Sequence, residues 1–188
     1  MVGYAFCGSY CTVGASLEAL QRLIADGREI CPIMSENAYA TDTRFFDAAR
    51  LRSKIESICG REIIHTVVEA ERLGPTTPLE SMIIAPCTGN TLAKLAHGIT
   101  DTSVTMAAKA HLRCDRPLLI ALASNDAISH NLAAISRLLM RKSVYFVPLL
   151  QDDPTGKPHS LVARMSLVPE CLSAMERGVQ LRPLFLTE

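Results

Sequence analysis

Short apolar runs alternate with helix-period segments along the whole chain of 188 residues, and this alternation restricts the fold more than any other feature. The run Pro117–Ala123 is apolar throughout, which is typical of a strand in a sheet covered on both faces. Strands are expected at residues 2–7, 30–34, 63–64, 82–85, 117–123 and 144–147. The pattern predicts an α/β fold: a doubly wound, Rossmann-like three-layer αβα sandwich with a mainly parallel six-stranded sheet.

Residues 1–188 are expected to form a single domain, because the sequence contains neither a linker nor an internal repeat. Pro, Gly and charged residues dominate positions 151–160, so the segment 148–165 is expected to be a flap or loop. Helices are expected at residues 17–24, 43–59, 90–97, 103–112, 128–139 and 169–177, with a long loop at 65–78.

Two of the expected strands end in small polar residues that lead directly into helices. The first loop contains Gly8–Ser9 and the second is Pro86–Cys87–Thr88–Gly89–Asn90–Thr91. Pro86 is expected to end strand pairing, and Gly89 to let a ligand approach the backbone. Because ligands bind where strand carboxyl ends meet helix amino ends, the two loops are expected to share one phosphate-bearing ligand.

One other interpretation of these loops stays open, and two others are not supported by the loop sequences. Thr88 or Asn90 acting only as a helix cap is the alternative to phosphate binding. The first loop lacks a complete G-x-G-x-x-G and the chain has no G-x-x-x-x-G-K-[ST], so neither a dinucleotide fingerprint nor a nucleoside-triphosphate loop is supported.

Charge and cysteine content exclude several classes of partner. The 19 basic and 19 acidic residues are well mixed, so no nucleic-acid partner is expected. No run reaches the roughly 18 apolar residues needed to cross a bilayer, so no membrane partner is expected either. Seven irregularly spaced cysteines indicate reduced thiols and a cytoplasmic protein. Cys7 and Cys11 lack the spacing of a zinc pair and are interpreted as core and loop residues, so no metal site is expected.

Several side chains are candidates for chemistry. Lys109 lies in a segment of small residues and either enters a pocket or extends into solvent. Asn125 and Asp126 follow the fifth expected strand, where Asp126 either orients a base or caps the next helix. These three are the catalytic candidates. The candidates for binding substrate carboxylates are Arg113, Lys157, His159 and Arg164. The alternative interpretation of each is a solvated charge on the protein surface.

The Gly8–Ser9 turn, the loop 85–91 and Ser124–Asn125–Asp126–Ala127 together resemble the flavoprotein family of homo-oligomeric, flavin-containing cysteine decarboxylases. In that family the second loop grips the phosphate of FMN, and the loop after the fifth strand lies against flavin and substrate. The resemblance implies a homo-oligomer, a trimer or a multiple of it, with FMN as cofactor. It implies that FMN is bound by Gly8, Ser9, Pro86, Thr88, Gly89, Asn90, Thr91, Ser124 and Asn125.

A closer resemblance, to one group of oxidoreductase subunits related to that family, is carried by the runs 85–101, 107–109, 124–127, 145–148, 151–154 and 157–158. It implies a B subunit from spore-forming bacteria that works with a nicotinamide-binding A subunit, on which NADP is the expected cofactor. The implied reaction, during sporulation, oxidises a dihydro or hydroxytetrahydro dicarboxylate precursor from the lysine pathway to pyridine-2,6-dicarboxylate.

The chain also departs from the decarboxylases. They carry a catalytic His after the third strand, whereas His65 is expected here to be buried and hydrogen-bonded, and their Cys-bearing glycine-rich clamp is absent from 148–165. Oxidative decarboxylation of a cysteine is therefore disfavoured. An FMN-dependent decarboxylase-like flavoprotein and a non-catalytic subunit that stabilises its partner stay open as alternatives.

Overall fold

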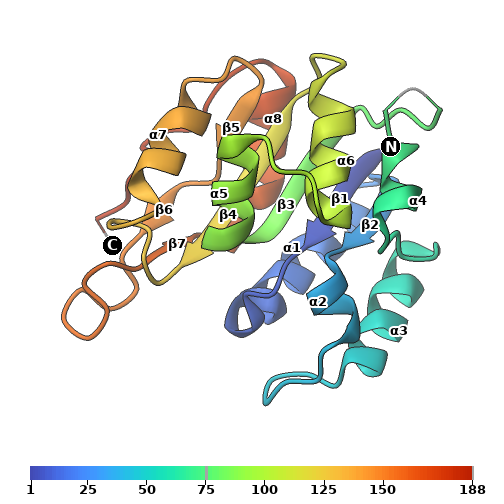
Figure 1. Ribbon diagram of the computed structural model, residues 1–188, viewed down its shortest axis with the longest axis horizontal. Coiled ribbons are helices and arrows are strands. Elements are labelled where there is room, and N and C mark those ends of the chain that lie inside the picture. Colours follow the sequence, from blue (N-terminus) through green and yellow to red (C-terminus); the bar gives the residue numbers. More distant parts are fainter. Residues whose placement is uncertain (75, 188) are drawn as a thin grey trace.

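The computed structural model describes residues 1–74 and 76–187 (Figure 1). Within these residues a seven-stranded sheet has the order β2-β1-β3-β4-β7-β6, with β5 paired to β4 beside that path. Strands β1 to β5 pair in parallel, whereas β7 is antiparallel to β4 and β6. The strands are β1 Val2–Phe6, β2 Ile30–Met34, β3 Ser81–Thr88, β4 Leu118–Ser124, β5 Val144–Phe146, β6 Leu149–Leu150 and β7 Leu161–Ala163. The expected mainly parallel α/β fold is confirmed.

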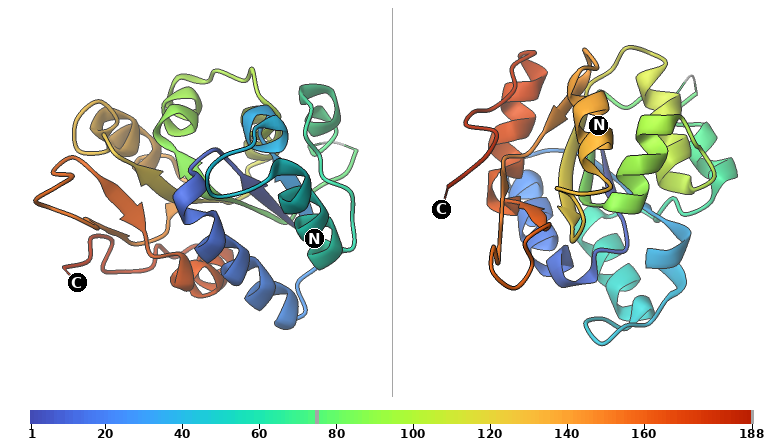
Figure 2. Two further views of the ribbon diagram at one scale, coloured as in Figure 1. Left: turned by 90° about the horizontal axis from the view of Figure 1, so that it is seen from below. Right: turned by 60° about the vertical axis from the view of Figure 1, so that its left-hand side comes forward.

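Helices cover both faces of the sheet, which gives three layers (Figure 2). Helices α1 Val13–Ala25 and α8 Val168–Glu176 pack together on one face. The opposite face carries α5 Gly89–His97, α6 Ser103–Leu112 and α7 Leu132–Leu139. Nearer β2 lie α2 Glu36–Ala40, α3 Ala48–Cys59 and α4 Val67–Glu71. None of the described helices is both long and apolar enough to cross a membrane.

The centre of the sheet is buried from both sides. Every residue of β4 is buried, in agreement with the apolar run seen in the sequence. Buried hydroxyl groups fix helix α1 on the sheet: the Tyr4 hydroxyl donates to the carbonyl oxygen of Ser16 at 2.9 Å, and Ser16 Oγ donates to the carbonyl oxygen of Ala85 at 2.5 Å. These bonds hold the amino end of α1 beside the carboxyl ends of β1 and β3.

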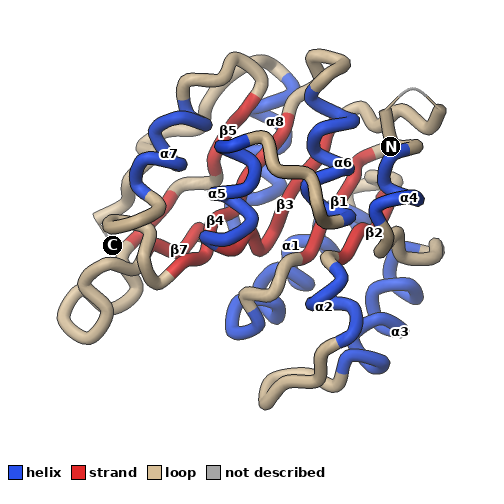
Figure 3. The backbone as a smooth tube through the Cα atoms, in the orientation of Figure 1, coloured by secondary structure: helices blue, strands red, loops and turns tan. Residues whose placement is uncertain are grey.

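Three strand expectations need correction. Residues 63–64 form only an isolated bridge between Ile64 and Ile33, because the chain turns away after one pairing. Pro86 does not end β3: the register shifts between Ile84 and Cys87, and pairing with β4 resumes as far as Thr88. The segment 148–165 contains β6 and β7, which extend the sheet, and leaves 151–160 between them (Figure 3).

The helix boundaries also differ from the expectation. Helix α3 begins at Ala48 rather than at residue 43, because the Asp47 carboxylate caps it and residues 41–47 form a loop. The expected loop 65–78, in which residue 75 lies outside the described residues, contains the short helix α4. Helix α7 begins at Leu132 instead of residue 128, after a series of turns.

Candidate functional site

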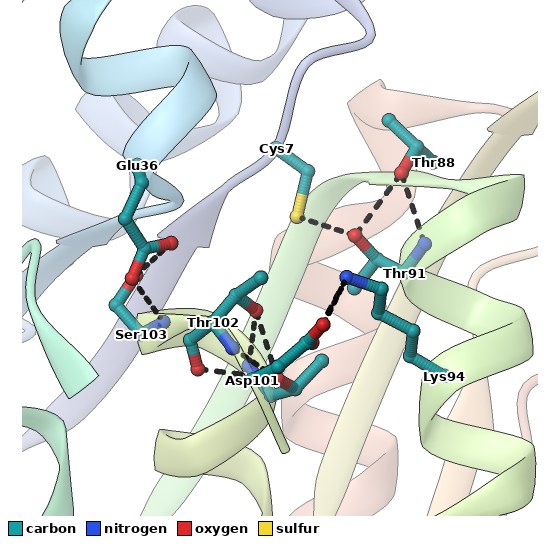
Figure 4. Close-up of polar contacts among 9 residues, drawn as sticks. Cys7, Glu36, Thr88, Thr91, Lys94, Asp101, Thr102 and Ser103 are labelled. Carbon is teal, nitrogen blue, oxygen red and sulfur yellow. Dashed lines mark hydrogen bonds and ion pairs between the residues drawn. The ribbon is translucent and has the colours of Figure 1, made fainter. Parts of the chain in front are cut away.

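Direct hydrogen bonds join the ends of β1 and β3. The backbone N–H of Cys7 donates to the carbonyl oxygen of Pro86 at 3.1 Å. The Thr91 hydroxyl donates to Cys7 Sγ at 3.4 Å and accepts from the Thr88 hydroxyl at 3.0 Å (Figure 4). Two loops about 80 positions apart in the sequence are therefore side by side at the carboxyl edge of the sheet.

Both loops line one cavity of about 710 Å³. The end of β4 with the loop after it, the segments 41–47 and 151–160, and Val162 of β7 complete its wall. The lining residues are Gly8, Ser9, Tyr10, Cys11, Thr12, Arg44, Phe45, Thr88, Gly89, Asn90, Ala123, Ser124, Asn125, Asp126, Asp152, Lys157 and Val162. The wall is rich in hydroxyl and amide groups, and it contains two carboxylates and two cations.

Most of the residues assigned to the cofactor lie on this wall. Seven of the nine line it, namely Gly8, Ser9, Thr88, Gly89, Asn90, Ser124 and Asn125. Pro86 and Thr91 are buried behind it. The Thr91 hydroxyl is committed to the bonds with Thr88 and Cys7, so it braces the loop from the core side.

The catalytic and substrate candidates divide between two places. Asn125, Asp126 and Lys157 line the 710 Å³ cavity. Lys109 and Arg113 instead line a separate cavity of about 260 Å³ between α5 and α6. His159 and Arg164 line neither of these two cavities, and the backbone N–H of Arg164 donates to the carbonyl oxygen of Pro148. The structure therefore does not bring Lys109, Arg113, His159 or Arg164 to the wall of the main cavity.

Thr88 caps helix α5. Its hydroxyl accepts from the backbone N–H of Thr91 at 3.1 Å, so the helix cap considered for this residue is present. The cap does not remove the residue from the cavity wall, because Thr88 is only partly buried and lines it together with Asn90. The amino end of α5 is thus directed at the cavity.

A polar cluster from the loop after β4 occupies the space above Gly89. Asp126 Oδ1 accepts from Ser124 Oγ at 2.6 Å and from Asn131 Nδ2 at 2.7 Å. A Cβ atom at position 89 would lie 2.5 Å from both donor atoms and 3.1 Å from Asp126 Oδ1. Gly89 is therefore required by the protein's own packing, rather than only by a ligand as expected.

The Asp126 carboxylate is held ionised. The Ser124 hydrogen bond is the main cause of its lowered pKa, and the bond from Asn131 adds to it. Asp126 does not cap α7, because that helix begins at Leu132 with Asn131 preceding it. A fixed negative charge next to Gly89 also disfavours a second anion at that point.

The loop 151–160 carries an ion pair on the cavity wall. Lys157 Nζ lies 3.0 Å from Asp152 Oδ2, and the Ser160 hydroxyl donates to Asp152 Oδ1 at 2.9 Å. The hydrogen bond to Asp152 raises the pKa of Lys157. Burial raises the pKa of Asp152, but its bonds with Lys157 and Ser160 outweigh burial and leave it lowered.

His65 is half-exposed rather than buried. Its ring stacks on Tyr39 with centroids 3.8 Å apart, and its Nδ1 lies 3.2 Å from the carbonyl oxygen of Ile63. The ring is also 3.6 Å from Glu69, and the residue does not line the main cavity. The stack on Tyr39 accounts for its position, which sequence spacing does not reveal.

Five cavity residues with polar or aromatic side chains are not predicted from the sequence: Tyr10, Thr12, Arg44, Phe45 and Asp152. The sequence contains one signal for two of them, since Arg44–Phe45–Phe46 is a basic-aromatic run within a polar segment. Because that segment is typical of the start of a helix, its pattern favours a surface helix face over a cavity wall. The other three lie in or beside the predicted loops: Tyr10 and Thr12 come soon after Ser9, and Asp152 lies in the segment 148–165.

Comparisons with known proteins agree with the family resemblance. The family model described as Flavoprotein matches residues 2–168. The B subunit of dipicolinate synthase from Bacillus subtilis (strain 168) is 40% identical over 185 residues, which cover 98% of this chain and 92% of that protein. The crystal structure of the B subunit of dipicolinate synthase from Bacillus halodurans is 40% identical with a TM-score of 0.91, and covers 100% of this chain and 96% of that one.

A more distant neighbour shows the fold alone. The crystal structure of the FMN-dependent cysteine decarboxylase SpaF is 20% identical with a TM-score of 0.65, over 94% of this chain and 95% of that one. The two levels of resemblance found in the sequence, to the family and to one group of its relatives, are both confirmed.

Proposed function

This chain belongs to the Flavoprotein family, and on that basis we propose that it is an FMN-binding B subunit of a dipicolinate-forming oxidoreductase. A nicotinamide-binding A subunit, with NADP as its cofactor, is its proposed partner. One observation carries the proposal: two strand-end loops line a single cavity, in a chain 40% identical to the B subunit of dipicolinate synthase over 98% of its length.

The cavity suits FMN in size and chemistry. Its volume of about 710 Å³ lies within the range of roughly 300–1,000 Å³ common for cofactor pockets. The Ser9 hydroxyl and the Asn90 side-chain amide offer donors to a phosphate, whereas the Thr88 hydroxyl donates to Thr91, and the amino ends of two helices face the same space. The fixed charge of Asp126 supports placing the phosphate toward Ser9 and Asn90, away from Gly89.

The remaining wall residues are assigned to the ring system and the substrate. Ser124, the last residue of β4, and Asn125, which follows it, are proposed to lie near the flavin ring. Pro86 and Thr91 shape and brace the loop from behind, so we replace their expected direct contact with a supporting role.

The proposed reaction is a two-electron oxidation that makes the ring aromatic, so the substrate loses a hydride and a proton. FMN, when bound, supplies an acceptor for the hydride. The chain's own residues hold a flat dianion in place and separate it from water, which is catalysis mainly by positioning. Because the pKa of Asp126 is lowered, its carboxylate is suited to accept a hydrogen bond from a ring N–H rather than to act as a general base near neutral pH.

The wider setting is part of the same proposal. All seven cysteines are free, which supports a reducing compartment such as the cytoplasm. A homo-oligomer, a trimer or a multiple of it, is supported by the crystal structure of a dodecameric FMN-dependent UbiX-like decarboxylase from Escherichia coli O157:H7 among the neighbours. A role in sporulation on a branch of the lysine pathway is proposed on the resemblance to these B subunits.

Reconstitution tests this function. The chain is purified alone and with its A subunit, and formation of pyridine-2,6-dicarboxylate is measured by absorbance with and without added FMN. We expect product only from the two subunits together, with a rate that depends on FMN. Full activity from the A subunit alone would contradict a catalytic role for this chain, and FMN-independent activity of the complex would contradict the cofactor assignment.

A further inference from the structure

The loop 41–47 between α2 and α3 carries two cavity residues, and its own hydrogen bonds hold it in shape. Thr43 Oγ1 accepts from the backbone N–H of Phe45 at 3.2 Å and of Phe46 at 3.1 Å. The backbone N–H of Thr43 donates to the carbonyl oxygen of Phe46 at 2.9 Å. Asp42 Oδ1 accepts from the N–H of Ala48 at 2.8 Å and fixes the far end. The loop is thus a braced turn with Arg44 and Phe45 at its tip.

Both tip residues line the 710 Å³ cavity. The guanidinium carbon of Arg44 lies 4.8 Å from the centroid of the Phe45 ring. This contact directs a planar cation along a planar apolar surface, and a guanidinium so held keeps its N–H groups available to a carboxylate. Phe45 is 46% exposed, so part of its ring is available to a flat ligand.

Arg44 is the cavity cation that has no carboxylate partner among the described residues. Lys157 is paired with Asp152 at 3.0 Å. The other cavity carboxylate, Asp126, is engaged by Ser124 and Asn131. Placing an anion against Arg44 therefore breaks no ion pair of the described protein, whereas placing one against Lys157 competes with Asp152.

We propose that Arg44, supported by Phe45, binds a carboxylate of the planar dicarboxylate substrate and selects it over monocarboxylates. This inference rests on the proposed function, since it names the contact that recognises the substrate class in the same cavity. It assigns the carboxylate contact to a residue outside the set Arg113, Lys157, His159 and Arg164, of which only Lys157 lines the cavity. The reaction chemistry itself does not require Arg44.

The first test measures binding to this chain alone. Isothermal titration with pyridine-2,6-dicarboxylate and with pyridine-2-carboxylate is carried out on the wild type, Arg44→Ala and Arg44→Lys. Because a hydrogen bond to a charged group contributes about 1.5–3 kcal/mol, Arg44→Ala should weaken dicarboxylate binding about 10- to 100-fold. Arg44→Lys should lose less affinity for the dicarboxylate than Arg44→Ala, because lysine keeps the positive charge but cannot make the bidentate contact. The wild type should prefer the dicarboxylate, and Arg44→Ala should lose that preference.

The second test uses the complex with the A subunit. Arg44→Ala should raise KM for the precursor by a similar factor while kcat changes less than about 3-fold, as expected for loss of uniform binding. Arg50→Ala is the matched control, since Arg50 is an exposed arginine of α3 that does not line the cavity. FMN affinity, measured by flavin fluorescence, should be the same in all variants.

The outcomes separate this proposal from the function on which it rests. Unchanged dicarboxylate binding in Arg44→Ala overturns the proposal. A fall in FMN affinity instead of dicarboxylate affinity also overturns it, because Arg44 then contacts the cofactor. If the complex forms no product but the isolated chain binds the dicarboxylate through Arg44, the proposed function fails while the binding role stands.

Discussion

Replacing Gly89 with alanine tests how the loop after β4 is seated on α5. The added Cβ would lie 2.5 Å from both Ser124 Oγ and Asn131 Nδ2, closer than real Cβ contacts come. Both atoms hold Asp126 Oδ1, so the clash must displace the cluster that fixes this part of the cavity wall. Overpacking of this kind costs about 1–3 kcal/mol. The gain in helix propensity from glycine to alanine returns at most about 1 kcal/mol.

Subtracting that gain leaves an expected net loss of up to about 2 kcal/mol, and its central value of about 1 kcal/mol lowers Tm by about 2–4 °C for a chain of this length. Gly14→Ala is the matched control, because Gly14 also lies in the first turn of a helix and its added Cβ would meet nothing within 4 Å. Differential scanning calorimetry should show a lower Tm for Gly89→Ala and an equal or slightly higher Tm for Gly14→Ala.

A second background shows whether the clash is the cause. Ser124→Ala removes one of the two atoms at 2.5 Å, so Gly89→Ala should cost less in that background than in the wild type. Equal Tm values for Gly89→Ala and Gly14→Ala would refute the reasoning. So would a Gly89→Ala cost that is the same with and without Ser124.

Three further predictions concern buried and exposed groups. Thr91→Val should lower the free energy of unfolding in urea by about 1 kcal/mol, because it removes the hydroxyl bonds to Thr88 and Cys7. The FMN dissociation constant should not change. A large rise in that constant would show that Thr91 contacts FMN directly. Burial lowers the pKa of His111, so the unfolded state binds the proton more readily than the folded state. The stabilisation from neutral His111 is fully present above the unfolded pKa of about 6.5, and it is lost as the pH falls below that value. In urea titrations between about pH 6.5 and 5, His111→Gln should therefore reduce the dependence of the free energy of unfolding on pH. An unchanged dependence would contradict this prediction. Iodoacetamide should label the exposed Cys11 and Cys114 before Cys7, whose pKa burial raises to about 11, and FMN should protect Cys11 alone because it lines the cavity; equal protection of Cys114 would argue against binding there.

Much of the fold is encoded locally and could be predicted. The all-apolar run that became β4 needs burial on both faces, and residues 103–112, where a helix was expected, form α6, with Val104, Ala107 and Ala108 at helical spacing on its buried face. Strands β6 and β7 have only two and three residues, and they form because β4 offers an edge rather than because of their own sequence. Such pairing cannot be read from composition rich in Pro and Gly.

The candidate site likewise has residues that could be predicted from the sequence and residues that could not. Gly8, Ser9, Thr88 and Asn90 were predictable because each lies at or just after the end of a strand, and strand ends of a parallel sheet share one edge. Arg44 comes from a loop between two helices, and only the tertiary fold brings it to that edge. Lys109 was a catalytic candidate, but the helix period that buries Ala107 and Ala108 also explains why Lys109 lies on the exposed face of α6.

The central proposal is that the loops after β1 and β3 hold one cofactor. An FMN titration of two loop variants tests this proposal most directly. Flavin fluorescence is followed for the wild type, Ser9→Ala, Asn90→Ala and, as a control on α8, Ser173→Ala. Since each loop is proposed to donate to the same phosphate, either loop variant should raise the dissociation constant about 10-fold or more, and the control should not. A wild type that does not bind FMN, or an effect confined to one loop, would contradict the account.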